Sequence, residues 1–207
     1  MPSYQQLRKK IKTGDLVLFS GKGGVSDWIK LFTGSKFSHI GLALVLSDDD
    51  QDMVLLLEST TLNDIEDIES GQIRRGVQLV PLSERVRTYK GKVYLRPLSK
   101  KPTPTMKKAL SKRRKQLSRL PYEKKKLELL RSAYDGPLGK NTETLSSLFC
   151  SELVAECYQA MGLLSDPPHG WPSNEYTPRD FSSEAVKPLK LETSGFSLKK
   201  EVRITGY

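Results

Sequence analysis

The fold of this chain depends first on the stretch FSHIGLALVL, residues 37–46. This apolar run ends at the turn-forming sequence SDDD, which predicts a strand. The second decisive stretch is LFCSELVAECYQAMGLL, residues 148–164, whose apolar side chains recur at helical spacing and predict a helix. A strand with one of the two histidines and a helix with both cysteines therefore form the centre of the predicted fold.

The other predicted elements surround these two. Four further strands are predicted at 15–19, 53–60, 76–82 and 92–98, with one more near 198–204. Helices are predicted at 26–34, 105–119 and 123–134, and a polar loop at 61–76. This order of elements predicts an α+β fold in which helices pack on a mostly antiparallel sheet.

Length and composition limit the class of protein. The 207 residues are enough for one domain, and we expect a single domain over residues 1–207. Apolar residues make up 37% and charged residues 28%, which excludes a disordered chain. The sequence has no signal peptide and no run of eighteen apolar residues, so a cytoplasmic protein is expected. Two cysteines cannot form a disulfide framework, which agrees with a reducing compartment.

The net charge of +10 is concentrated in one segment. Residues 100–131 contain thirteen Lys or Arg and two acids, a net charge of +11, so the rest of the chain sums to about −1. Such a segment suits phosphate groups, either of lipid headgroups or of nucleic acid. The alternative is a solvated helix face with no partner.

Cys150 lies near the predicted start of the 148–164 helix, on its apolar stripe. Free backbone N–H groups at a helix N-terminus stabilise a thiolate and bind an oxyanion. The alternative is a buried cysteine of the core. Cys157 follows two turns later, about 10 Å along the helix, too far for a disulfide, and is predicted to be core.

A nucleophilic thiol requires a base, and the chain has two histidines. His169 lies in the loop PPHGWP, with no evident partner. His39 shares a strand face with the small residues Gly41 and Ala43, which would let the cysteine helix approach closely. The alternative is a partly exposed strand histidine.

Glu58 closes the apolar run MVLLL, where a carboxylate is costly unless it is paired. It could accept a hydrogen bond from the second ring nitrogen of His39, as the acid of a catalytic triad does. The alternative is a strand-end glutamate in solvent. The spacing of the two cysteines and two histidines matches no compact zinc site, and we expect no metal and no cofactor.

The segments GDLVLF, SHIGL, VLLLEST, FCSELV and YTPRDF, in this order, resemble the circularly permuted branch of the NlpC-type papain-like cysteine hydrolases. The YiiX-like proteins are the nearest group, and lecithin:retinol acyltransferase and a poxviral relative share the permuted layout. In that layout the histidine strand precedes the cysteine helix, as it does here. The resemblance covers about residues 14–181 and implies a papain-like core over that range.

The resemblance also implies roles for four residues. Cys150 corresponds to the nucleophile, His39 to the base and Glu58 to the orienting acid. Tyr122, in the P-Y-E stretch, corresponds to a tyrosine upstream of the cysteine that helps form the oxyanion site. The backbone N–H of Cys150 is the second expected oxyanion donor.

The predicted function is that of a thiol hydrolase that forms an acyl-enzyme on Cys150. Family members act on amides, thioesters or lipid esters, so the activity is that of a peptidase, an amidase, a lipid acyl hydrolase or an acyltransferase. The basic segment 100–131 slightly favours a lipid substrate at an anionic membrane. A virus-encoded enzyme is compatible with the sequence.

The alternative is a non-catalytic basic module that binds membrane or nucleic acid, with Cys150 structural. Within the basic segment only Tyr122 is aromatic, so base stacking is poorly provided for and nucleic acid is less favoured.

Overall fold

The computed structural model describes residues 1–21, 34–48, 51–60, 62–118 and 142–206, without the side chains of 47–48, 51–52 and 142–149. The predicted helix at 123–134 and nearly all of the one at 26–34 lie outside the described residues. None of the helices described here is long and apolar enough to cross a membrane.

A six-stranded sheet forms the middle layer, in the order β6-β3-β2-β1-β7-β8. Its strands are β1 (Leu16–Gly21), β2 (His39–Asp48), β3 (Gln51–Thr60), β6 (Gly76–Pro81), β7 (Gly91–Arg96) and β8 (Val202–Ile204). Each neighbouring pair is antiparallel. The long β2–β3 hairpin brings Gly41 opposite Glu58. All the predicted strands are therefore present, although the last is shorter than expected.

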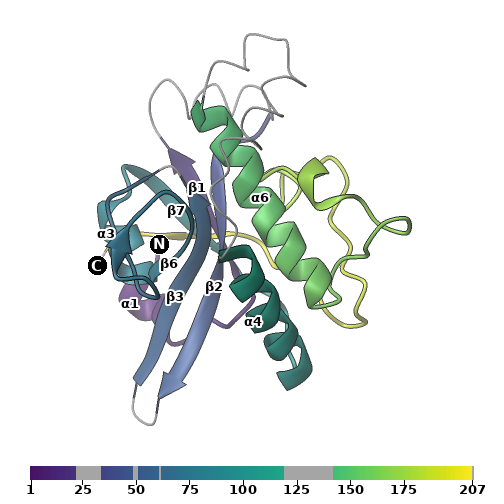
Figure 1. Cartoon of the computed structure of the whole chain (residues 1–207), viewed down its shortest axis with the longest axis horizontal. Coiled ribbons are helices and arrows are strands. Elements are labelled where there is room, and N and C mark those ends of the chain that lie inside the picture. The colour runs from purple at the N-terminus through teal and green to yellow at the C-terminus, as the bar shows by residue number, and fades with distance from the viewer. Residues whose placement is uncertain (22–33, 49–50, 61, 119–141, 207) are drawn as a thin grey trace.

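Helices cover both faces of the sheet (Figure 1). The long helices α4 (Pro104–Ser118) and α6 (Thr142–Ala160) lie on one side. The short helices α1 (Tyr4–Arg8) and α3 (Leu82–Thr88) lie on the other. The predicted α+β architecture, with helices packed on an antiparallel sheet, is confirmed.

The alternation of side chains along β2 determines which residues meet which helices. Ile40 and Leu42 are fully buried in the core that contains Leu153 and Val154 of α6. Ala43 is fully buried in the core of the opposite face, with residues of α1 and α3. The sheet thus separates two apolar layers, and α6 belongs to only one of them.

This arrangement contradicts one prediction. The small residues Gly41 and Ala43 were expected to face the cysteine helix, but α6 packs on the other face of β2. A Cβ atom at Gly41 would lie 2.7 Å from the Leu56 side chain and 2.9 Å from the Leu57 carbonyl oxygen. Gly41 therefore makes room for the adjacent strand β3 rather than for a helix.

Residues 62–76 also contain more regular structure than the loop predicted at 61–76. They contain a small hairpin of β4 (Glu66–Asp67) and β5 (Gln72–Ile73). The buried Asp67 carboxylate accepts hydrogen bonds from the backbone N–H of Leu79 (2.8 Å) and from the Ser70 hydroxyl (2.7 Å). These hydrogen bonds attach the hairpin to β6. The hairpin could not be predicted from apolar periodicity, because polar side chains hold it in place.

Candidate active site

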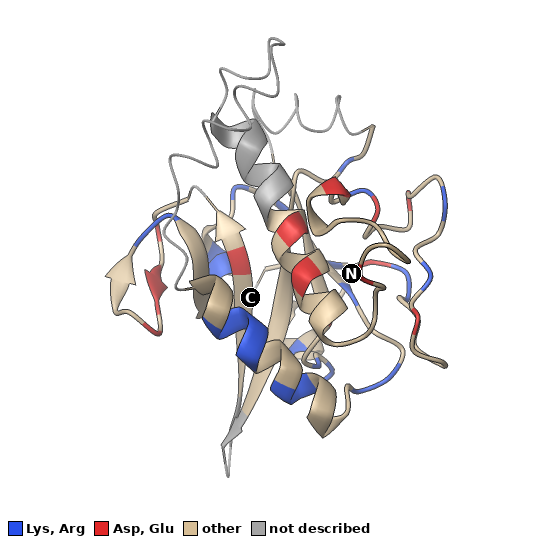
Figure 2. Cartoon of the chain, turned by 45° about the vertical axis from the view of Figure 1, so that its right-hand side comes forward, with Lys and Arg blue, Asp and Glu red and all other residues tan. Residues whose placement is uncertain are grey.

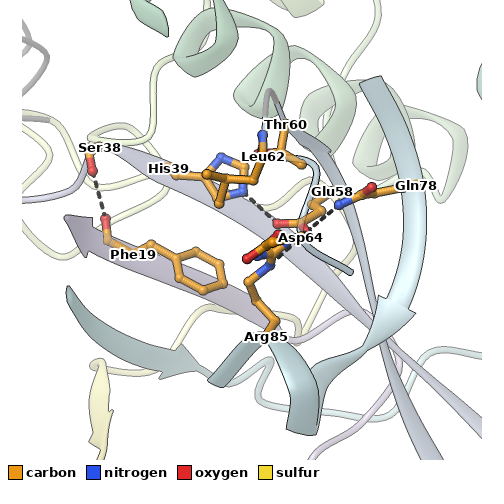
Figure 3. Close-up of polar contacts among 9 residues, drawn as sticks. All are labelled: Phe19, Ser38, His39, Glu58, Thr60, Leu62, Asp64, Gln78 and Arg85. Carbon is orange, nitrogen blue, oxygen red and sulfur yellow. Dashed lines mark hydrogen bonds and ion pairs between the residues drawn. The ribbon is translucent and has the colours of Figure 1, made fainter. Parts of the chain in front are cut away.

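His39 and Glu58 lie on neighbouring strands at the end of the sheet where β2 begins (Figure 3). His39 is the first residue of β2, and its Nε2 lies 2.8 Å from Oε2 of Glu58. The Glu58 side chain is fully buried, and that of His39 is 11% exposed. The carboxylate therefore faces the ring inside the protein rather than solvent.

Cys150, on α6, completes this group and is fully buried. Burial by itself would lower the pKa of His39, but the charge of Cys150 and its hydrogen bond, followed by those of Glu58, raise it to about 9. Because Nε2 is bonded to Glu58, a hydrogen bond between the ring and Cys150 requires the other ring nitrogen, Nδ1. The structure thus brings together the three residues that the sequence indicated.

Glu58 has more partners than His39 alone. Its Oε1 accepts hydrogen bonds from Nε2 of Gln78 (3.0 Å) and from Nε and Nη2 of Arg85 (2.9 and 2.7 Å). Burial would raise the pKa of Glu58, but the bond with His39 and the charge of Arg85 lower it to about 2. The carboxyl is therefore ionised throughout the neutral range.

Arg85, on α3, is a site residue that the sequence analysis missed. Its side chain is fully buried, and Nη1 donates to both carboxylate oxygens of Asp64, at 2.9 and 3.0 Å. A signal existed in the sequence, because Arg85 falls on the buried stripe of α3 with Leu82 and Val86. A charged residue on such a stripe indicates a buried partner.

An aromatic side chain covers another side of the His39 ring. The Phe19 ring lies 5.1 Å from the ring of His39 and 4.8 Å from that of Tyr89. Burial raises the pKa of Tyr89, while a hydrogen bond with the Ser38 side chain opposes the rise. Phe19 therefore forms an apolar wall on one side of the imidazole.

The position of Cys150 in its helix differs from the prediction. Helix α6 begins at Thr142, so Cys150 is its ninth residue and not in its first turn. In a regular helix an interior N–H is donated to the carbonyl four residues earlier, so the Cys150 N–H is not a free oxyanion donor. The apolar stripe starts only at residue 148, and the polar first two turns gave no such signal.

Three further residues of the sequence analysis remain to be placed. Tyr122 lies outside the described residues. His169 is exposed in its loop. Cys157 is fully buried, and burial raises the pKa of its thiol to about 12, which confirms its prediction as core.

The site is thus a buried Cys-His-Glu group at one end of the antiparallel sheet of an α+β fold. No family model matches the chain, and no curated protein matches it. The crystal structure of the metalloprotein YiiX from Escherichia coli O157:H7 is similar, with a TM-score of 0.47 and 17% sequence identity, over 95% of this chain and 97% of that chain. The relation to NlpC-type hydrolases and to lecithin:retinol acyltransferase stays a prediction.

The site residues do not suit a metal ion. Within the described ranges, no three His, Cys, Asp or Glu side chains form a group that could hold one. The oxygens of Glu58 are already occupied by Arg85, Gln78 and His39. We therefore derive the chemistry of the site from its side chains alone.

Proposed function

We propose that the domain is a cysteine hydrolase in which Cys150 attacks an acyl carbon and forms a covalent acyl-enzyme. One observation carries the proposal: His39 is hydrogen-bonded to the Cys150 thiol and to the Glu58 carboxylate inside the protein. A nucleophile next to a base, with the base oriented by a third group, is the arrangement that acyl transfer requires.

In the first step the proton of the Cys150 thiol resides on His39, and the thiolate sulfur bonds to the acyl carbon. His39 then protonates the leaving amine, thiol or alcohol as its bond to the carbon breaks. In the second step His39 removes a proton from water, which attacks the thioester and releases a carboxylic acid and the free thiol. An acyl acceptor in place of water gives transfer instead.

Glu58 supports both steps without touching the substrate. Its carboxylate accepts from Nε2 of His39 and so fixes which ring nitrogen faces Cys150. It also stabilises the imidazolium that forms in each step. We accordingly assign Glu58 the role of orienting acid.

The test is labelling with a charge-neutral alkylating agent as a function of pH, with mass spectrometry to locate the label. We expect selective labelling of Cys150 that continues well below about pH 8.5, where a free cysteine titrates. The His39→Ala variant should lose this reactivity at low pH while keeping the circular dichroism of the wild type.

A matched control lies on the same helix. Cys157→Ser removes the second thiol, so any label that remains belongs to Cys150. Equal labelling of wild type and His39→Ala at pH 6 would contradict the proposal. If labelling of Cys150 depends on His39 as expected, the next step is to compare esters, thioesters and amides as substrates.

A second candidate function rests on α4. This helix carries Lys or Arg at six positions and no acidic residue (Figure 2). Lys107, Lys108, Lys112 and Lys115 are exposed, whereas Met106 and Leu110 are buried in the core. This basic face suits the phosphates of an anionic membrane, which would bring a lipid acyl substrate to the site.

This candidate is tested by sedimentation with vesicles of phosphatidylserine and phosphatidylcholine. The double variant Lys112→Glu/Lys115→Glu should release the protein from the vesicles. The control Lys187→Glu/Lys190→Glu changes the net charge equally at exposed positions away from α4. Equal loss in both variants would show a net-charge effect and remove α4 as the binding face.

A further inference from the structure

We propose that Arg85 is a positioning residue of this site, which holds Glu58 as a carboxylate with Oε2 directed at His39. The inference rests on the proposed function because it concerns the same Cys150–His39 pair. Arg85 contacts Glu58 directly and acts on His39 and Cys150 through it.

The geometry around Glu58 separates its two oxygens. Nε and Nη2 of Arg85 both donate to Oε1, and Gln78 donates to the same oxygen. Oε2 then bonds to Nε2 of His39. Three donors on one oxygen fix the plane of the carboxylate and so direct the second oxygen at the imidazole.

The opposite side of the guanidinium is held as well. Nη1 of Arg85 donates to both oxygens of Asp64, whose side chain is 40% exposed, whereas that of Arg85 is fully buried. Figure 3 shows Arg85 between the two carboxylates. A buried guanidinium that is bonded to a carboxylate on each side is held in one orientation, so Arg85 serves as a rigid support for Glu58.

The charges at the site come from every layer of the fold. Strands β2 and β3 supply His39 and Glu58, and α6 supplies Cys150. The segment before β4 supplies Asp64, α3 supplies Arg85, and Tyr89 follows α3 with a phenol whose pKa is raised by burial. Arg85 is thus the permanent cation next to Glu58, since His39 is a cation only when protonated.

Arg85 is needed because Glu58 has no contact with solvent. Burial favours the protonated carboxyl, and the His39 bond and the Arg85 charge oppose it. Without Arg85, Glu58 would take up a proton at a higher pH and would cease to stabilise the imidazolium. The thiolate–imidazolium pair would then revert to its neutral form.

The test is the pH dependence of the Cys150 alkylation rate. The acid limb is the part of this curve where the rate falls as the pH is lowered. In Arg85→Met we expect this limb to move up by about one pH unit or more, which is about a tenfold lower rate at pH 6. Arg85→Lys keeps the charge but loses the two-pronged contact, so a shift between wild type and Arg85→Met is expected. If Arg85→Met does not fold, Arg85→Lys decides the test by the same limb.

The matched control is Arg87→Met, on the same helix, where the side chain is 61% exposed and pairs with Glu84. Its acid limb should equal that of the wild type. A limb that does not move in the folded Arg85 variants, with only a lower melting temperature, would make Arg85 structural and overturn the inference. An equal shift in Arg87→Met would also overturn it.

A second measurement separates this inference from the proposed function. His39 can be titrated by NMR, because the chain has only one other histidine and His169→Gln assigns the signals. We expect a lower pKa of His39 in Arg85→Met than in the wild type, whether or not Cys150 is reactive. If Cys150 is unreactive but the pKa of His39 is lower in Arg85→Met, the hydrolase proposal is refuted and the positioning role of Arg85 stands. If the pKa of His39 is unchanged, only the positioning role is refuted.

Discussion

The two cysteines of α6 lie two turns apart and are both fully buried in the same apolar cluster, yet their polar neighbours differ. Cys150 meets the His39 ring, which the Glu58 carboxylate and Arg85 support from the strands and from α3. Cys157 lies in the apolar core, where burial raises the pKa of its thiol to about 12. Burial alone therefore does not determine the chemistry of a thiol in this protein.

The difference arises from what the sheet presents to each end of the helix. Along most of α6, β2 and β3 offer leucine and isoleucine side chains. At the end where β2 begins, the side chain of its first residue, His39, interacts with Cys150 and is bonded to Glu58. A reactive site thus requires polar groups that satisfy one another, as these do, since an unpaired buried charge would destabilise the fold.

The largest effect is expected from Glu58→Gln, which removes the charge that distinguishes the Cys150 region. Hydrolysis of an activated ester such as p-nitrophenyl acetate should fall by about 10²–10⁴-fold. The free energy of unfolding should also fall by about 3–5 kcal/mol, because Arg85 loses its fully buried anionic partner and keeps Asp64, whose side chain is 40% exposed.

The double variant Glu58→Gln/Arg85→Met separates these two effects. It removes both members of the buried pair, so urea denaturation should show that part of the stability returns. Hydrolysis should remain as low as in Glu58→Gln. Full activity in the folded double variant would remove Glu58 from the mechanism.

The pH dependence of the free energy of unfolding should report on His39, in the Cys150 region. The pKa of His39 is raised from 6.5 to about 9 in the folded protein, so folding binds a proton more tightly. This contribution is fully present below pH 6.5 and is lost as the pH rises through 9. Each pH unit between the unfolded and folded pKa of the imidazole corresponds to about 1.4 kcal/mol of stability. The melting temperature of the wild type should therefore fall more steeply than that of His39→Gln as the pH rises from 6.5 to 9. Parallel curves for the two proteins would contradict the raised pKa.

A smaller effect, confined to stability, is expected at the other cysteine. Cys157→Ser places a hydroxyl in an apolar core and should lower the free energy of unfolding by about 1–3 kcal/mol. Alkylation of Cys150 should keep its wild-type rate and pH profile. A well-folded Cys157→Ser protein without reactive Cys150 would contradict the separation of the two regions.

The smallest effect is expected at Tyr158, next to Cys157. Its buried hydroxyl donates to the Gly14 carbonyl oxygen at 2.7 Å. Tyr158→Phe loses this single bond and should cost about 1 kcal/mol in urea denaturation, with Cys150 labelling unchanged. A change in the labelling rate would show that the apolar part of α6 influences the site.

Much of the site could be predicted because its chemistry is rare in the sequence. Two histidines and two cysteines leave few combinations, and Glu58 is conspicuous at the end of an apolar strand. Gln78 was missed because it is the one polar residue of a strand that was predicted from its apolar pattern. Arg85 was missed because it is one of several polar residues in α3. The start of α6 was misplaced because its first residues are polar, and helix formation there needs no apolar stripe.

The sequence by itself determined the strands of the main sheet, the long cysteine helix and the residue types able to perform nucleophilic chemistry, because periodicity and composition are local properties. Only the tertiary structure decided that α6 packs on the Ile40 face of β2, that Cys150 reaches His39, and that Arg85 closes the group behind Glu58. The physical reason is that these contacts join segments far apart in the chain. Periodicity predicts that a face is buried, but it does not state which element covers that face.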